Sequence, residues 1–219
     1  GLSINPSTGL ISGTINSSAS VGGPYTVLIT ATDPQGASVT QNFVWTVTNP
    51  VPIAQDDNFS VNENGTISGN VLANNGNGAD SDRDGDTFAV TAAAGGAGNV
   101  GNVSGSVANV GNATAGSNGG LFTINSNGTL SFQPNGNFDY LALGQSATTT
   151  ITYTLTDANG ATDTATVSVL VTGLNDAPVA VGVIAAQSGA DSSTVNLNVS
   201  PFFADPDTSN TLTFSHGGT

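Results

Sequence analysis

Residues 150–172 read TITYTLTDANGATDTATVSVLVT, with apolar side chains at every second position on both sides of an Asp-Ala-Asn-Gly turn. These apolar residues are Ile151, Tyr153 and Leu155 before the turn, and Ala165, Val167, Val169 and Val171 after it. Successive side chains of a β-strand point to opposite faces. The alternation therefore predicts two long strands, each with one buried face, joined by the turn.

The same alternation recurs outside this stretch. Tyr25, Val27 and Ile29 share one face of an expected strand, as do Phe43 and Trp45 of the next. We find no convincing stretch with the 3.6-residue period of a helix. Strands rich in Thr and Val, separated by Asn-Gly and Asp-Xaa-Xaa-Gly turns, predict an all-β sandwich.

An internal repeat predicts how the chain is divided. The turn at 156–161 resembles residues 32–37, and each copy is followed by an alternating strand and a proline linker. We therefore expect a complete sandwich at 50–176, the closing half of a module at 1–49 and the opening half of another at 177–219. The stretch 92–120, rich in Ala, Gly and Asn, is expected to hold strands separated by long loops.

Composition excludes several classes of protein. The 219 residues carry a net charge of −14 and one basic side chain, Arg83, which argues against binding to nucleic acid or to anionic membranes. Without Cys or Lys, the chain can form neither disulfides nor lysine isopeptide cross-links. No apolar run is long enough for a membrane helix. The absence of Met predicts an internal piece of a longer polypeptide.

The acidic residues are clustered most densely in Asp80-Ser81-Asp82-Arg83-Asp84-Gly85-Asp86. Carboxylates this close repel one another by roughly 1 kcal/mol or more per pair, and a single arginine cannot neutralise four of them. Alternate carboxylates around a glycine are a common way for a short loop to bind Ca²⁺. The twelfth position of the loop is Thr91 instead of glutamate, so we do not expect an EF-hand.

Several motifs resemble known bacterial repeats. Residues 69–74, 84–87, 152–160 and 173–178 are similar to VCBS and bacterial cadherin-like repeats. Residues 1–14 resemble the second half of a dystroglycan-type cadherin-like, Ig-like domain, and residues 201–207 and 211–215 resemble its first half. The resemblance implies a large bacterial surface adhesin or fibre in which Ca²⁺ holds successive modules in line.

Two positions depart from these repeats. Asn74-Asn75 stands where the repeats have Asn-Asp, and Glu63-Asn64 where they have Glu-Asp. Both positions are weaker ligand candidates for that reason.

If the central module has seven antiparallel strands, its acidic loops gather at its two ends. One end would hold the acidic loop, the 157–159 turn and the incoming linker, and the other would hold the first strand's end, the outgoing linker and the next module. The predicted Ca²⁺ ligands are Asp80, Asp82, Asp84, Asp86, Asp157 and Asn49 at the first end, and Glu63, Asn175, Asp176, Asp205 and Asp207 at the second. Asp33 is a further candidate, which in a head-to-tail arrangement would meet Asp205 and Asp207 of the neighbouring copy.

Other readings of the acidic residues stay open. Asp33 and Asp157 begin turns in which aspartate occurs without metal. Asp56 and Asp57 are expected to be solvated, and Asp139 and Asp191 to lie on the surface.

An enzyme is not expected, because His216 is the only histidine and the carboxylates lie in loops instead of across a cleft. The sequence predicts a calcium-stiffened extender of an extracellular bacterial adhesin or fibre. One alternative is a filament in which half-modules of neighbouring copies complete one another head to tail, either as separate chains or as repeats of one polypeptide. A sugar- or ligand-binding adhesive module is another, although Trp45 and Tyr153 lie in alternating strands typical of core residues.

Overall fold

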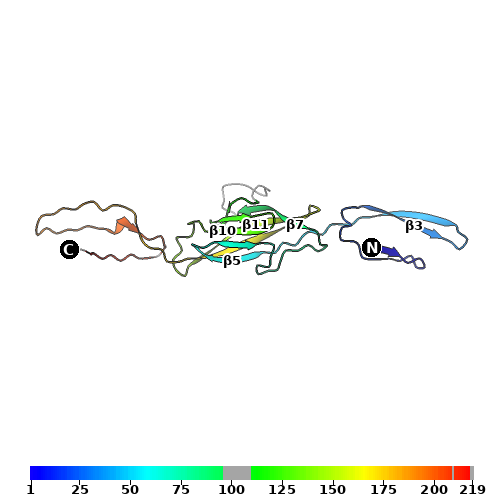
Figure 1. The fold of residues 1–219 in the computed structure, drawn as a ribbon, viewed down its shortest axis with the longest axis horizontal. Coiled ribbons are helices and arrows are strands. Elements are labelled where there is room, and N and C mark those ends of the chain that lie inside the picture. The colour runs from blue at the N-terminus through cyan, green and yellow to red at the C-terminus, as the bar shows by residue number, and fades with distance from the viewer. Residues whose placement is uncertain (96–109, 209, 218–219) are drawn as a thin grey trace.

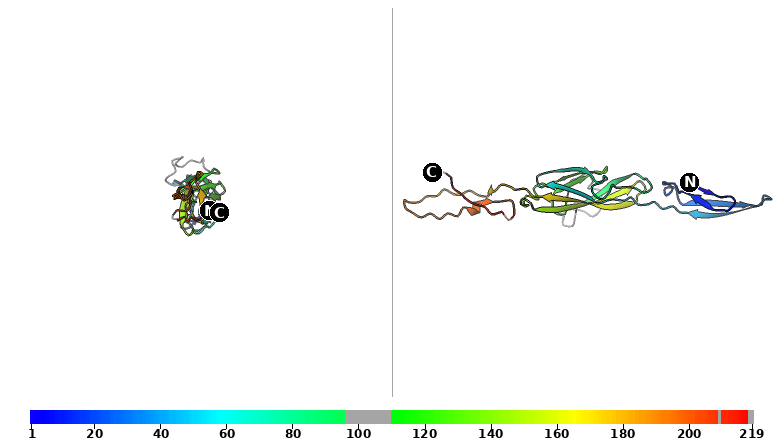
Figure 2. Two further views of the ribbon diagram at one scale, coloured as in Figure 1. Left: turned by 90° about the vertical axis from the view of Figure 1, so that its left-hand side faces the viewer. Right: turned by 90° about the horizontal axis from the view of Figure 1, so that it is seen from below.

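The computed structural model describes residues 1–95, 110–208 and 210–217. Figure 1 shows a long, narrow molecule with a β-sandwich in the middle and a segment extending from each end. Figure 2 shows that the termini belong to opposite ends of its long axis. We call residues 1–49 the N-terminal segment and residues 177–217 the C-terminal segment. Within the stretch 92–120, where we expected loops and strands, residues 96–109 lie outside the described residues.

The first sheet of the central sandwich contains the hairpin expected from residues 150–172. Its strands pair in the order β5-β12-β11-β7. Thr156 pairs with Thr162 beside the turn, and the antiparallel pairing continues to Ser146 and Thr172. The four strands are β5 (Asp57–Asn62), β7 (Phe88–Gly95), β11 (Ser146–Asp157) and β12 (Thr162–Thr172).

The second sheet packs against the first and has the order β6-β10-β9-β8. Its pairings β10–β6, β10–β9 and β8–β9 are all antiparallel. The four strands are β6 (Ile67–Asn70), β8 (Thr114–Ala115), β9 (Leu121–Ile124) and β10 (Thr129–Gln133).

The supposition of seven antiparallel strands is wrong for this sandwich. Among the described residues its two sheets contain eight strands, and β5 pairs with β12 in parallel. The reason is that the chain crosses from β5 into β6 of the opposite sheet instead of turning back beside β5. A parallel neighbour can then be supplied by a distant part of the chain.

The core lies between the two sheets. The inward positions of the predicted hairpin, Ile151, Tyr153, Leu155, Val167 and Val169, are each at most 1% exposed. Phe122 and Phe132 of the second sheet belong to the same core, and the centroids of their two rings lie 4.5 Å apart. Every hydrophobic residue in the buried core of the described chain falls between Ile67 and Val171.

The two end segments are built from short two-stranded sheets. These are β1 (Leu2–Ile4) with β2 (Ile11–Gly13), β3 (Tyr25–Thr32) with β4 (Ser38–Trp45), and β13 (Val179–Ala180) with β14 (Phe203–Ala204). The C-terminal segment also has a short 3-10 helix, Ser200–Phe202. No helix in the described part of the chain is long and apolar enough to cross a membrane.

Candidate metal centres at the two module junctions

The junction between the N-terminal segment and the sandwich is organised by the β11–β12 turn. The Asp157 Oδ1 accepts hydrogen bonds from the backbone N–H groups of Asn159 and Ala161, both at 2.9 Å. Its Oδ2 lies 2.6 Å from the Asn49 Nδ2, and the Asn159 Nδ2 donates to the Asn49 Oδ1 at 2.9 Å. The Asn159 amide also donates to the Asp86 Oδ2. The structure thus brings Asn49, Asp86 and Asp157 together, as the sequence suggested.

Two further aspartates of the acidic loop carry buried oxygens at this junction. The Asp82 Oδ1 accepts the backbone N–H groups of Asp84, Gly85 and Asp86 at 3.1–3.2 Å, which folds the loop around it. The Asp82 Oδ2 and the Asp84 Oδ1 are buried and have no hydrogen-bond partner among the described residues. Both are acceptors, so a proton or a cation is needed to satisfy them.

The two carboxyl groups lie close enough to share a proton. This side-chain hydrogen bond lowers the pKa of Asp82 and raises the pKa of Asp84. Asp84 also lines a hollow of about 340 Å³ between the N-terminal segment and the sandwich, together with Asn16, Ser20 and Pro50. The neighbouring Asn16 and Ser20 carry further oxygens that a cation could use.

Asp80 is directed elsewhere. Its Oδ1 accepts the Gln55 N–H at 2.7 Å, and its Oδ2 accepts the Tyr153 hydroxyl at 2.9 Å. Burial raises the pKa of Asp80. The structure therefore places this carboxylate against the core tyrosine, apart from the unpartnered oxygens of Asp82 and Asp84.

Asp57 is a buried acid that the sequence analysis missed. The expectation that it is solvated is wrong, because its side chain is only 1% exposed. The Asn75 Nδ2 donates to its Oδ1 at 2.7 Å, while its Oδ2 has no partner within the described chain. Burial raises its pKa to about 6. Its alternation with Phe59 and Val61, both packed against the core, could have revealed its orientation.

The opposite junction gathers acids from three parts of the chain. Glu63, directly after β5, is 2% exposed, and its Oε1 accepts the Leu174 N–H at 2.6 Å. Asp207 is 3% exposed, and its Oδ2 accepts the Asp176 N–H at 3.1 Å. The Asp205 Oδ1 in turn accepts the Asp207 N–H at 3.0 Å. The Glu63 Oε2 and the Asp207 Oδ1 are buried without a partner in the described residues.

Asp139 belongs to this second cluster, although we expected an isolated surface residue. Burial and then the charges of Asp176, Asp207 and Asp139 raise the pKa of Glu63. Burial, Asp207, Asp139 and Asp205 likewise raise the pKa of Asp176. Beside Asp139, the Tyr140 carbonyl accepts the backbone N–H and the hydroxyl of Thr208 at 2.9 and 2.8 Å. The sequence around Asp139 gives no sign of a ligand, because the residue directly follows the core residue Phe138. Only the tertiary structure, which brings the C-terminal segment to this junction, identifies Asp139 as a member of the cluster.

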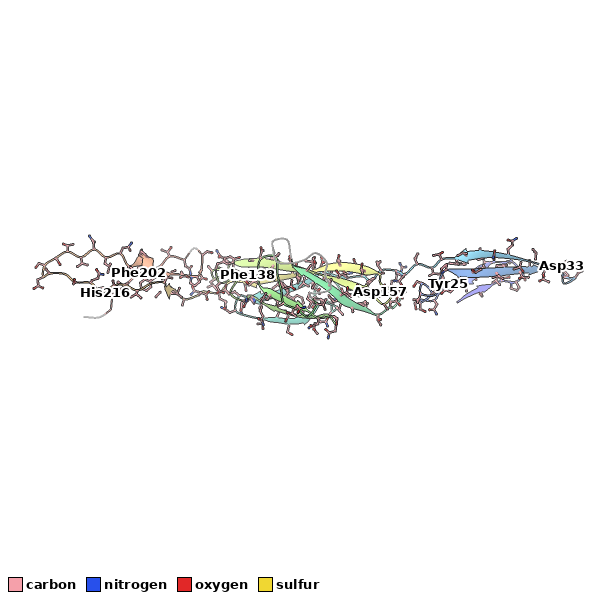
Figure 3. The ribbon with its side chains drawn as sticks, turned by 90° about the horizontal axis from the view of Figure 1, so that it is seen from above. Tyr25, Asp33, Phe138, Asp157, Phe202 and His216 are labelled. Atoms are coloured by element: carbon pink, nitrogen blue, oxygen red, sulfur yellow. The ribbon has the colours of Figure 1, made fainter. Side chains whose placement is uncertain are left out.

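Two predicted ligands are exposed, and only Asn175 lies at a junction, where it lines a hollow with Asp176 and Asp205. Asn175 is exposed and its Nδ2 donates to the Asp176 carbonyl at 3.0 Å. Asp33 is exposed in the β3–β4 turn, and Figure 3 places it at the end of the N-terminal segment farthest from the sandwich.

These residues fit a hard cation in their donor chemistry. In the described parts of the chain, no three His, Cys, Asp or Glu side chains are already arranged to hold a metal. Each junction nevertheless has two buried carboxylate oxygens without a partner among the described residues, and Asn side chains line a hollow at each junction. Ca²⁺ binds six to eight oxygens from carboxylates, amides, carbonyls and water, so carboxylates need not supply the whole shell.

Two models of known protein families together match residues 1–173. The family model described as "Bacterial cadherin-like domain" matches residues 48–173, and the one described as "Putative Ig domain" matches residues 1–48. A search among curated proteins found no match.

Solved structures show only loose likeness. A nucleoside hydrolase-related hypothetical protein from Saccharophagus degradans is 18% identical at a TM-score of 0.29, over 54% of this chain and 22% of its own. Extracellular cadherin domains 1–5 of protocadherin gamma B2 are 14% identical at a TM-score of 0.31. This match covers 74% of this chain and 34% of the protocadherin chain. The chain therefore spans only 22–34% of the length of these structures, and TM-scores below 0.5 carry no weight for its function.

Proposed function

Because the chain belongs to the bacterial cadherin-like domain family, we propose that it is a calcium-stiffened extender of an extracellular bacterial adhesin or surface fibre. The observation that supports this most is the set of buried, unpartnered carboxylate oxygens at the two junctions, on Asp82 and Asp84 at one and on Glu63 and Asp207 at the other. A buried charge without a partner is costly, and a divalent cation would remove that cost.

The positions of these oxygens explain how a cation would stiffen the molecule. At the first junction, Asp82 and Asp84 would hold it next to Asn49 of the linker. At the second, Glu63 and Asp139 of the sandwich would share it with Asp176 of the linker and Asp207 of the C-terminal segment. Each cation would then restrain the hinge between two units. Domains of this family are typically structural and not enzymatic, which agrees with such a role.

Thermal unfolding in Ca²⁺ and in chelator tests the proposal. Metal that binds only the native state stabilises it by about 2.7 kcal/mol at a concentration 100 times its Kd. We therefore expect the midpoint of the sandwich transition to rise by several degrees in saturating Ca²⁺, with a smaller rise in Mg²⁺ at the same ionic strength. Equal midpoints in Ca²⁺ and in chelator would overturn the calcium proposal.

Trypsin gives a local readout at the first junction. Arg83 is the only Lys or Arg residue, so trypsin can cut only inside the acidic loop, between Arg83 and Asp84. We expect slow cleavage in Ca²⁺ and, in chelator, rapid cleavage to two fragments. Cleavage of a chymotrypsin site at Tyr25, outside the loop, serves as the control for general effects of Ca²⁺ on the protein. Rapid tryptic cutting in saturating Ca²⁺ would contradict the ligand assignment at this junction.

A further inference from the structure

The β3–β4 hairpin of the N-terminal segment has an apolar face that its own chain leaves open. Cross-strand partners in an antiparallel pair lie on the same face. Tyr25 pairs with Trp45, Val27 with Phe43 and Ala31 with Val39. Along this face Val39 is 62% exposed and Phe43 is 40% exposed. A two-stranded sheet is marginal in water unless such a face is covered.

Strand β1 and the residues that follow β2 border this face only in part. Leu2 and Ile15 line an open hollow of about 390 Å³ together with Tyr25, Val27, Trp45 and Val47. A complete sandwich would fill this space with side chains from a second sheet. The N-terminal segment is thus half of a sandwich in its packing as well as in its sequence.

The C-terminal segment also exposes apolar side chains that its own chain does not cover. Its apolar residues alternate in three extended runs, which contain Val179, Val181 and Val183, then Val195 and Leu197, then Leu212 and Phe214. Val181 is 58% exposed, Val195 67% and Phe214 48%. Alternating apolar residues are typical of strands with one buried face, yet none of these side chains is buried in the described chain.

We propose that the C-terminal segment of one copy of this chain packs against the N-terminal segment of a second copy and completes one sandwich between them. The two segments lie at opposite ends of the long axis, so they cannot cover each other within one molecule (Figure 2). Together they contain the strands β1 to β4 and three alternating runs, which is close to the seven strands of an ordinary Ig-like sandwich.

The turn at Asp33 shows how the second copy would be oriented. The Asp33 Oδ1 accepts the backbone N–H groups of Gln35 and Ala37 at 3.0 and 2.8 Å, as the Asp157 Oδ1 accepts those of Asn159 and Ala161. Both turns lie at the same end of their units in Figure 3. In the sandwich, this turn contacts the incoming linker through Asn49.

The same arrangement would bring Asp33 of the second copy to the linker at Asn175, which precedes Pro178 as Asn49 precedes Pro52. Asp33 would then lie beside Asp205 and Asp207 and add a carboxylate to the second junction. This last contact rests on the calcium proposal, whereas the apolar packing does not.

Cross-linking tests the orientation. The chain has no cysteine, so introduced thiols are unique. In Gln35→Cys/Asn175→Cys, a short bis-maleimide should give a ladder of covalent oligomers. Asn49→Cys/Asn159→Cys is the matched control, since these residues touch within one molecule and should give a cross-linked monomer. Gln35→Cys alone can give dimers at most. A Gln35→Cys/Asn175→Cys protein that stays at 21.5 kDa, or stops at dimers, would overturn the proposal.

Complementation of two defective variants tests the packing. Val39→Asp removes the apolar face of the N-terminal segment, and Phe214→Asp removes that of the C-terminal segment. By analytical ultracentrifugation in chelator, the native chain should form oligomers that lengthen with concentration, and each variant alone should be monomeric. Their mixture should form dimers only, because one intact face of each kind remains.

Leu143→Asp is the control, because Leu143 is 72% exposed on the sandwich and outside both segments. Its oligomers should match those of the native chain. A native chain that is monomeric at high concentration, or variants that oligomerise alone, would exclude the association even if the calcium experiments succeed.

Discussion

The acidic residues of the sandwich are held in different chemical states by their surroundings. Asp56 is exposed and its Oδ1 accepts the Thr166 N–H at 2.8 Å. The adjacent Asp57 points inward, where Asp80 and the Tyr153 hydroxyl lie close to it. Tyr153 also donates toward the carbonyls of Gln55 and Val71, at 3.1 and 3.3 Å. Burial, Asp57 and Asp80 together raise the pKa of this tyrosine, so it stays protonated as a donor.

Asp57→Asn should stabilise the protein at neutral pH. The folded-state pKa of Asp57, about 6, lies above its ordinary value of 3.8, so the proton favours the folded state. This stabilisation is complete below pH 3.8 and is lost as the pH rises through 6. A shift of this size corresponds to about 3 kcal/mol. We expect urea unfolding in chelator at pH 7.5 to show a gain of about 1–3 kcal/mol for the variant.

The neighbouring substitution Asp56→Asn provides the control, since Asp56 is exposed. It should change the free energy of unfolding little at pH 7.5. An Asp57→Asn protein less stable than the native chain at pH 7.5 would show that the ionised carboxylate is used in the fold.

At the scale of elements, the turn between β9 and β10 joins two parts of the second sheet. Gly128 lies there at φ +82°, in the region that favours glycine, and the Val71 N–H donates to its carbonyl at 2.9 Å. An added Cβ would also come within 2.4 Å of the Leu72 Cγ. The residue is therefore constrained both by its backbone and by its neighbours.

Gly128→Ala should lower the free energy of unfolding by about 2–4 kcal/mol, because backbone strain of roughly 1–2 kcal/mol adds to the clash. Gly144→Ala is matched in backbone conformation, with φ +87°, but an added Cβ would have no atom within 4 Å. Gly144→Ala should lower the free energy of unfolding only by the backbone strain. Equal losses in the two variants, measured by chemical denaturation, would show that Leu72 moves aside freely.

At the scale of the whole molecule, three units follow one another along one axis (Figure 1). The sandwich is connected to the C-terminal segment by one linker and a few polar contacts, including those of Tyr140 with Thr208 and Asp176 with Asp207. Repulsion among the acids of this junction works against a straight arrangement. A bound cation would reverse that effect.

Small-angle scattering at low protein concentration should therefore give a larger radius of gyration in Ca²⁺ than in chelator. Glu63→Gln removes a charge at the second junction and should reduce this difference by about half, because the first junction is unchanged. Asp191→Asn removes the same charge from an exposed site away from the cluster and should leave the difference intact. If Glu63→Gln behaves like Asp191→Asn, the second junction does not bind the ion that stiffens the chain.

The sequence by itself determined the all-β fold and the β11–β12 hairpin. These follow from period-two alternation and turn residues, which act over a few neighbouring positions. The parallel pairing of β5 with β12, the inward course of Asp80 and the addition of Asp139 to the second cluster were decided only by the tertiary structure. Each depends on which distant segment lies opposite, and local patterns carry no information on that. Asp57 is an intermediate case. Its alternation with Phe59 and Val61 indicates from the sequence that it points inward, but only the tertiary structure shows that its Oδ2 lacks a hydrogen-bond partner among the described residues.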